Sequence, residues 1–205
     1  NPGWIGNLVG FIEQGGTEAQ TRRNLNTLFG LTYKVPFIDG LTISGRMSPT
    51  FIDTTLHQLD KKVTIYDVAK EGSNGAIYTD SVIGSEQSAY PTKEKYAQAS
   101  SKTTSYQLDF SANYIKKFGK HNLDALVVYE QSEGKYDYFY GARENFPLVQ
   151  EGQFWATSSS RTDSYVDGVQ SENGRASYIG RVAYNYDEKY FVNVTVREDG
   201  SMLFA

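Results

Sequence analysis

Few side chains in this 205-residue sequence are of the types that catalyse reactions or bind metal ions. There is no cysteine, which excludes disulfides, thiolate zinc sites and cysteine nucleophiles. The two histidines are His57, in an expected loop, and His121, beside an expected turn. Neither has a second histidine or a carboxylate at ligand spacing, so we expect no metal site and no cofactor. The motifs GxSxG, GxGxxG and the P-loop do not occur either.

Paired carboxylates are the only arrangement that suggests catalysis. Glu130 with Glu133, or Asp163 with Asp167, could in principle act as the acid and base of a glycosidase. Because the chain has 24 Asp and Glu residues, such pairs arise by chance. We therefore expect that the chain is not an enzyme, and a glycan-cleaving β enzyme ranks last among our functional hypotheses.

One segment, residues 135–155, has the composition of a binding surface. Flat aromatic rings pack against the C–H faces of sugars, and a guanidinium donates hydrogen bonds to hydroxyls. The alternative is that the tyrosines continue a strand and pack on neighbouring side chains or on a lid protein. The candidate ligand-binding residues are Tyr136, Tyr138, Tyr140, Arg143 and Trp155.

Charge and hydropathy exclude two large classes of protein. The formal net charge is −4, which does not suit nucleic acid, whose binding requires many phosphate-neutralising cations. A membrane helix needs about 20 consecutive apolar residues, whereas the longest aliphatic run here is Ala125–Val128. Membrane β-barrels stay possible because their strands alternate polar with apolar residues. The 16 Tyr and 11 Phe residues favour β-structure.

Alternation of apolar and polar residues predicts six strands in three hairpins. Leu31, Leu108, Val127, Val182 and Val194 belong to the apolar set, and Asn113, Asp124, Arg181 and Asn193 to the polar set. The predicted pairs are 24–34 with 41–46, 106–114 with 122–130, and 175–186 with 190–197.

The lengths of strands and connections favour a section of an antiparallel transmembrane β-barrel. The predicted strands have about 9–12 residues, as membrane crossing requires. Three connections are short, near 36–40, 116–121 and 187–189, and tyrosine or phenylalanine flanks each. Two are long and polar, 47–105 and 131–174. Short periplasmic turns and long extracellular loops are typical of outer-membrane barrels. The alternative is a secreted, soluble β-sandwich that binds carbohydrate, in which the apolar set would be buried against a second sheet.

The two long connections are expected to differ in content. Residues 63–66 and 76–78 predict a further hairpin that projects beyond the membrane. Residues 84–103 and 156–174 are rich in Ser, Thr, Gln and Gly and predict irregular loops.

The last 30 residues carry a resemblance to a known family. Residues 174–204 resemble the barrel signature of SusC/RagA-type TonB-dependent outer-membrane transporters, in which SYxGRxxYxYxxKY leads through a tight turn to RxDGSxxF. Residues 29–48 and 108–131 are similar to two upstream hairpins of that family, although Val128 stands where the family often has glycine. The matching residues of the last block are Ser177, Tyr178, Gly180, Arg181, Tyr184, Tyr186, Lys189, Tyr190, Arg197, Asp199, Gly200, Ser201 and Phe204.

The resemblance implies that residues 1–205 are part of a single TonB-dependent receptor β-barrel domain in the bacterial outer membrane. The implied function is import of an oligosaccharide or peptide, with a SusD-like surface lipoprotein as lid. Energy would come from the TonB–ExbB–ExbD complex through a plug domain that is absent from this sequence. Six strands are fewer than the smallest membrane barrels use, so we expect the section to be incomplete on its own, with open edges at its first and last strands.

Overall fold

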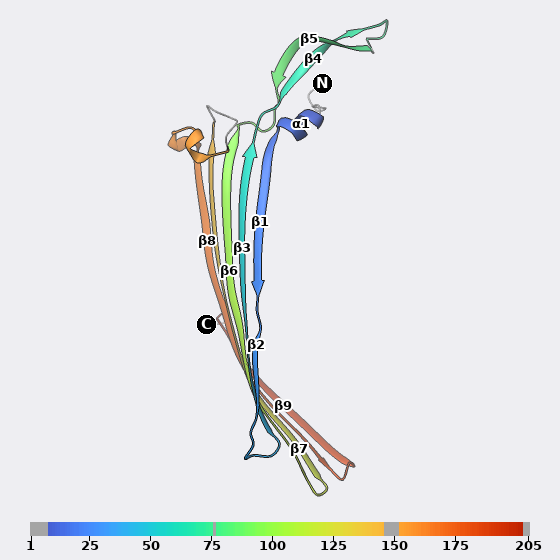
Figure 1. Ribbon diagram of the computed structural model, residues 1–205, viewed down its shortest axis with the longest axis vertical. Helices are drawn as coiled ribbons and strands as arrows, with labels where there is room; N and C mark the ends of the chain where they lie inside the picture. The colour runs from blue at the N-terminus through green and yellow to red at the C-terminus, as the bar shows by residue number, and fades with distance from the viewer. Residues whose placement is uncertain (1–7, 76, 146–151, 203–205) are drawn as a thin grey trace. The chain divides into compact units, whose positions relative to one another are not determined.

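The structure is a computed structural model, and it describes residues 8–75, 77–145 and 152–202. It is almost entirely β-strand (Figure 1). No helix in these ranges is long and apolar enough to cross a membrane. In chain order the elements are α1 (Leu8–Gln14), β1 (Gly16–Asn26), β2 (Phe29–Lys34), β3 (Leu41–Asp60), β4 (Thr64–Glu71), β5 (Ile77–Gln87), β6 (Lys95–Phe118), β7 (His121–Glu144), the 3-10 helices η1 (Phe154–Ala156) and η2 (Arg161–Asp163), β8 (Ser164–Tyr186) and β9 (Tyr190–Ser201).

The described strands form two sheets. The larger has seven strands in the order β1-β3-β6-β7-β8-β9, with β2 also paired to β3, and the smaller consists of β4 and β5. Contacts within the chain divide it into two compact units, and several strands run from one unit into the other. The first unit contains residues 1–21, 54–100 and 139–168, and the second contains 22–53, 101–138 and 169–205.

All three predicted hairpins are present, although the predicted strand 24–34 is divided between β1 and β2, and the strand registers show which residues share a face. In β8 and β9, Val182 lies opposite Val194, and Arg181 lies opposite Thr195. In β2 and β3, Tyr33 lies opposite Ile43. Directly opposed residues of an antiparallel pair project from the same side. The apolar set therefore lies on one face of the sheet, and the polar set on the other.

The turns follow the local chemistry of their residues. Asp187 and Glu188 both have positive φ, 53° and 58°, as in a type I′ hairpin turn. Asp187 also binds Lys120 and Lys189 at 3.3 and 3.0 Å. Between β6 and β7, Gly119 has φ 62° at the first position of a two-residue loop, where a type II′ turn favours glycine.

The strands are much longer than predicted. The prediction that 47–105 and 131–174 are long loops is wrong for most of these residues, because they belong to strands. β3 has 20 residues and β6 and β7 have 24 each, about twice what a membrane crossing needs. Residues 95–103 belong to β6 and 164–174 to β8, although we expected irregular structure there. Polar strand extensions lack the aliphatic alternation that reveals a strand, but their backbones still pair with neighbouring strands. The hairpin expected around 63–66 and 76–78 is confirmed as β4 and β5, with residue 76 outside the described ranges.

The ends of β6 and β7 show that their pairing does not slip. The turn joins Phe118 to His121, and beyond the far ends the N–H of Asn145 donates to the carbonyl of Glu94 at 3.1 Å. Each strand therefore advances 24 residues between these two points. Because side chains alternate with a period of two, the face of any residue on β7 follows from its parity.

Candidate functional site

The apolar face of the second unit is open. Leu31 is 75% exposed and Val127 62% exposed. Val182 and Val194 are also exposed, and Leu108 is half-buried. A soluble sandwich would bury these side chains under a second sheet, so the sandwich hypothesis fails on the part of the chain that the structure describes.

Two rows of aromatic rings bound this apolar face. At one level Tyr129 and Tyr178 pair across β7 and β8 with ring centroids 5.1 Å apart. Eight residues away on each strand, His121 and Tyr186 pair at 5.0 Å. On β6, Tyr106 and Tyr114 have the same eight-residue spacing. The row near the short turns was predicted, whereas the row of Tyr106, Tyr129 and Tyr178 was not.

The spacing of these rows has a physical meaning. Eight residues of antiparallel strand span about 27 Å along the strand, which at the usual tilt of about 35–45° rises about 19–22 Å, close to the roughly 25 Å apolar band of outer-membrane barrels. Beyond the second row the same face becomes polar: Gln131 donates to Tyr106 Oη at 2.9 Å and to Glu133 at 3.0 Å. Tyr and His rings suit such a boundary because part of each ring is apolar and part hydrogen-bonds.

The polar set shares the opposite face, as predicted, and some of its members form cross-strand pairs. Arg181 binds Asp124 at 2.9 Å, and Asn122 donates to Asn185 at 2.7 Å. Asp124 Oδ1 and Arg181 Nε are buried and have no partner among the described side chains. Asn113 Oδ1, on the same face, is a third such atom, so the described part of this wall retains two acceptors and one donor that a further protein segment or water can satisfy.

Three residues of the family signature meet on the polar face of β8 and β9. Arg197 Nε donates to both carboxylate oxygens of Asp199, at 2.8 and 2.9 Å. Its terminal nitrogen donates to the hydroxyl of Ser177 at 3.4 Å. Ser177 lies opposite Asp199 in the register. The bond from Arg197 to Ser177 therefore links β9 to β8, and nothing in the geometry of these residues suggests catalysis.

The five predicted ligand-binding residues are divided between the two units: Tyr136 and Tyr138 belong to the second, and Tyr140, Arg143 and Trp155 to the first. By parity on β7, Tyr136, Tyr138 and Tyr140 lie on the polar face, the face of Asp124. Arg143 has the opposite parity and lies on the other face. In the first unit, Tyr140 lies near the ammonium of Lys95, which binds Asp60 at 3.2 Å.

Trp155 lies on the short helix η1, where it is 72% exposed. Its neighbour Phe154 anchors the helix by packing edge-on against Tyr96 with centroids 5.0 Å apart, beside Leu59. Phe154 thus makes the apolar contact of this helix, and the Trp155 indole is exposed. His57 is in strand β3, where a loop was expected, and its ring bonds to Tyr96 Oη at 3.1 Å.

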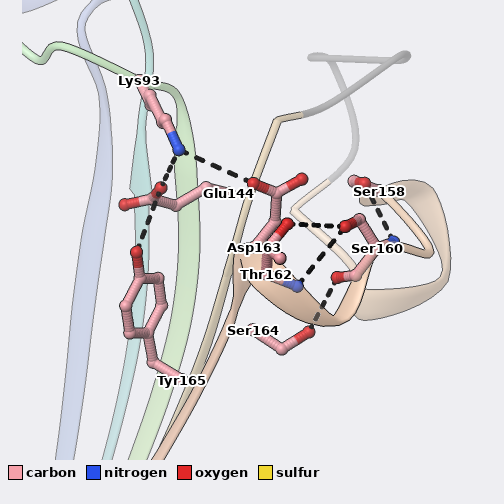
Figure 2. Close-up of polar contacts among 8 residues, drawn as sticks. All are labelled: Lys93, Glu144, Ser158, Ser160, Thr162, Asp163, Ser164 and Tyr165. Carbon is pink, nitrogen blue, oxygen red and sulfur yellow. Dashed lines mark hydrogen bonds and ion pairs between the residues drawn. The ribbon is translucent and has the colours of Figure 1, made fainter.

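A cluster of charged and hydroxyl side chains fixes the ends of β7 and β8 in the first unit (Figure 2). Lys93 Nζ lies 2.9 Å from Glu144 and 3.6 Å from Asp163. Tyr165 donates to Glu144 at 3.4 Å. Ser160 caps η2 by accepting from the N–H of Thr162 at 3.3 Å. We call Lys93, Glu144, Asp163 and Tyr165 the rim cluster.

The rim cluster shifts the ionisation of two of its members. Hydrogen bonds from Asn145 and Ser158, together with Lys93, lower the pKa of the Asp163 carboxyl. The hydrogen bond and charge of Glu144 raise the pKa of the Lys93 ammonium, and the Asp163 carboxylate adds to this. Both groups are therefore charged at neutral pH, and they hold the segment that carries Trp155 against the strand ends.

Comparison with known proteins gives a match in structure but none in sequence. No protein-family model and no curated protein matches the chain. Three solved structures match over 93% of it: the RagAB peptide importer in its open-open and closed-closed states, and the RagAB peptide transporter. Their TM-scores are 0.71–0.72 and their sequence identity is 15%. The chain shares the fold of a section of those transporter chains. It spans only 18–19% of their length.

Sequence reasoning missed the second aromatic row and the rim cluster. The row could have been found from the sequence, because Tyr106 and Tyr114 are eight residues apart and so are Tyr178 and Tyr186. The rim cluster could not, since Lys93 and Asp163 come from distant segments of irregular structure. In the described ranges, no three His, Asp or Glu side chains form a group that could hold a metal ion.

Proposed function

We propose that this chain is part of the barrel wall of a SusC/RagA-type, TonB-dependent nutrient importer of the bacterial outer membrane. The observation that carries the proposal is an open apolar face bounded by two aromatic rows one membrane thickness apart. The fold shared with the RagAB chains supports it. In this role the apolar face contacts lipid and the polar face lines the lumen.

The ligand is an oligosaccharide or a peptide, and a SusD-like lipoprotein closes the barrel from outside. Both ligand classes offer hydrogen-bonding groups and apolar faces, which tyrosine and tryptophan side chains can bind. Tyr136, Tyr138 and Tyr140 are proposed to line the ligand path, and Trp155 to meet ligand or lid. Because Arg143 lies on the opposite face, its proposed role is limited to contacts outside the lumen. No covalent step is needed, since TonB supplies the work through a plug.

Lipid contact is tested with nitroxide labels at Leu31, Leu108, Val127, Val182 and Val194 in the complete transporter. In lipid vesicles, each label should be accessible to oxygen, which partitions into hydrocarbon, and protected from a water-soluble nickel chelate. A label at Thr195, on the polar face, should show the reverse preference. Exclusion of oxygen from all five positions would overturn the proposal.

The ligand path is tested by two adjacent residues on opposite faces of β7. Tyr138→Ala should weaken uptake of the ligand, whereas Phe139→Ala, which removes an exposed ring from the other face, should leave uptake unchanged. Trp155→Ala should weaken uptake or affinity without unfolding the barrel. Peptide and oligosaccharide mixtures, supplied separately to cells with and without TonB, decide the ligand class and the energy source. Equal uptake by the two β7 variants would remove the tyrosines from the path.

A further inference from the structure

We propose that the outer face carries a binding site for a lipid with an anionic, phosphate-containing headgroup, formed by Arg23 and Lys102 above Leu25 and Phe51. The inference rests on the proposed membrane location and adds a specific lipid site to it. The four side chains line a single hollow of the second unit, together with Asp53.

The register of neighbouring strands brings the two cations together. Arg23 lies 3.5 Å from Asp53 across β1 and β3. Between β3 and β6, the N–H of Ile115 donates to the carbonyl of Gly40, and Arg46 lies 3.7 Å from Asp109. Extending this register along β6 places Lys102 beside Asp53. One carboxylate therefore separates the two cations, and the β6–β7 register places Asp137 on the other side of Lys102, so cations and carboxylates alternate along this level of the face.

The hollow lies at the boundary of the apolar face. Leu25 and Phe51 are the last apolar residues on that face of β1 and β3 before it becomes charged, and both side chains are exposed. The next residues on the same face are Arg23 and Asp53. Acyl chains can therefore contact the two apolar side chains while the headgroup reaches the cations.

The cations are available to a ligand. The Arg23 side chain is 76% exposed and that of Asp53 44% exposed, and ion pairs this open to water contribute little. Lys102 is exposed and has no ion pair among the described residues. Guanidinium binds phosphate through two parallel hydrogen bonds, and an ammonium adds a point charge. Arg23 should therefore bind a phosphate headgroup more strongly than it binds the exposed carboxylate of Asp53.

The test uses the complete transporter in detergent, titrated with dioleoyl phosphatidylglycerol or the zwitterionic dioleoyl phosphatidylcholine and followed by native mass spectrometry. The variant R23Q/K102Q removes the proposed site. The control R22Q/K34Q removes the same charge from the opposite face, since Arg22 adjoins Arg23 and Lys34 pairs with Thr42 on the polar side. Unheated gel mobility confirms that both variants are folded.

We expect the wild type to bind phosphatidylglycerol in preference to phosphatidylcholine. Because each near-surface cation contributes a factor of about five, R23Q/K102Q should bind it roughly 5 to 25 times more weakly. The control should bind like the wild type. Equal binding of the two lipids, no loss in R23Q/K102Q or the same loss in both variants would overturn the site. Full displacement of the lipid by millimolar inorganic phosphate would assign the cations to a free anion and also overturn it. A transporter whose nitroxide labels avoid lipid would instead refute the proposed function.

Discussion

At the scale of single residues, the amino-acid type matters most where the backbone conformation accepts only glycine. Gly40 has φ 92°, and a Cβ added there would overlap the carbonyl of Ile115, the residue whose N–H donates to the Gly40 carbonyl and so ties the first turn to β6. Gly180, in β8, has an ordinary φ and no atom within 4 Å of an added Cβ. These two glycines therefore differ in what they can tolerate.

Gly40→Ala should destabilise the complete barrel by about 1–3 kcal/mol, since it forces a side chain into the left-handed region and into Ile115. Gly180→Ala should change stability by less than about 0.5 kcal/mol. Urea titration of folding into vesicles measures both. Equal costs would show that the turn relaxes away from the close contact.

The two faces of β9 give the second residue-scale prediction. Val194, opposite Val182, should face hydrocarbon, and Thr195, opposite Arg181, should face water. Val194→Arg near mid-membrane should therefore cost about 2–4 kcal/mol, and Thr195→Arg much less. The same folding titrations apply. If both substitutions have the same cost, the assignment of faces is wrong.

At the scale of elements, the rim cluster determines how the segment before β8 is held. Its contacts are electrostatic and partly exposed, so they depend on pH in a way that the strand ladders do not. The lowered pKa of Asp163 means that its ionised form stabilises the rim fully above about pH 4, the ordinary carboxyl value, and that this contribution is lost as pH falls through the lowered pKa. The raised pKa of Lys93 has the opposite sense: its contribution is present below the ordinary lysine value and is lost as pH rises through the raised pKa.

A nitroxide on the exposed Ser159 should therefore become more mobile as the pH falls below about 4, while the strands stay folded. Asp163→Asn should cause the same mobility at pH 7, because the uncharged amide no longer attracts Lys93. Asp167→Asn is the matched control, since within the described ranges the Asp167 carboxylate accepts a hydrogen bond only from the neighbouring backbone N–H of Gly168. Electron paramagnetic resonance line shapes provide the measurement. An unchanged line shape in Asp163→Asn would show that hydrogen bonds alone hold the segment.

At the scale of the whole molecule, the described sheet ends in two edge strands. β1 and β9 are the two ends of the strand order, and the outer edge of each pairs with no other strand among the described residues. The matched RagAB chains are about five times longer. The structure of this chain therefore fits a section of a larger barrel.

A polypeptide of these 205 residues alone should fail to form a heat-resistant species in vesicles, because its open edges expose unpaired N–H and C=O groups to hydrocarbon. The complete transporter should show the usual shift in gel mobility between heated and unheated samples. Protease digestion of vesicle-bound protein gives an independent measurement. A protected, monomeric 205-residue species would show that the section closes on itself.

Sequence alone determined the parts of this protein that depend on local pattern. Alternation located three hairpins and assigned Val182 and Val194 to one face and Arg181 to the other, because side-chain direction has a period of two along any strand. The turn at Asp187 and Glu188 was also predicted from residue type. The same parity rule separates Tyr138 from Arg143, but it could be applied only once β7 was known to continue through both.

Only the tertiary structure decided how far the strands extend and which distant residues meet. Polar extensions such as 95–103 form strands because neighbouring backbones pair with them, a contact that no local pattern reports. The pairing of Tyr129 with Tyr178 and of Lys93 with Asp163 likewise depends on register and on loop closure. Interactions between residues far apart in the chain are set by the whole sheet, and one strand's sequence does not contain them.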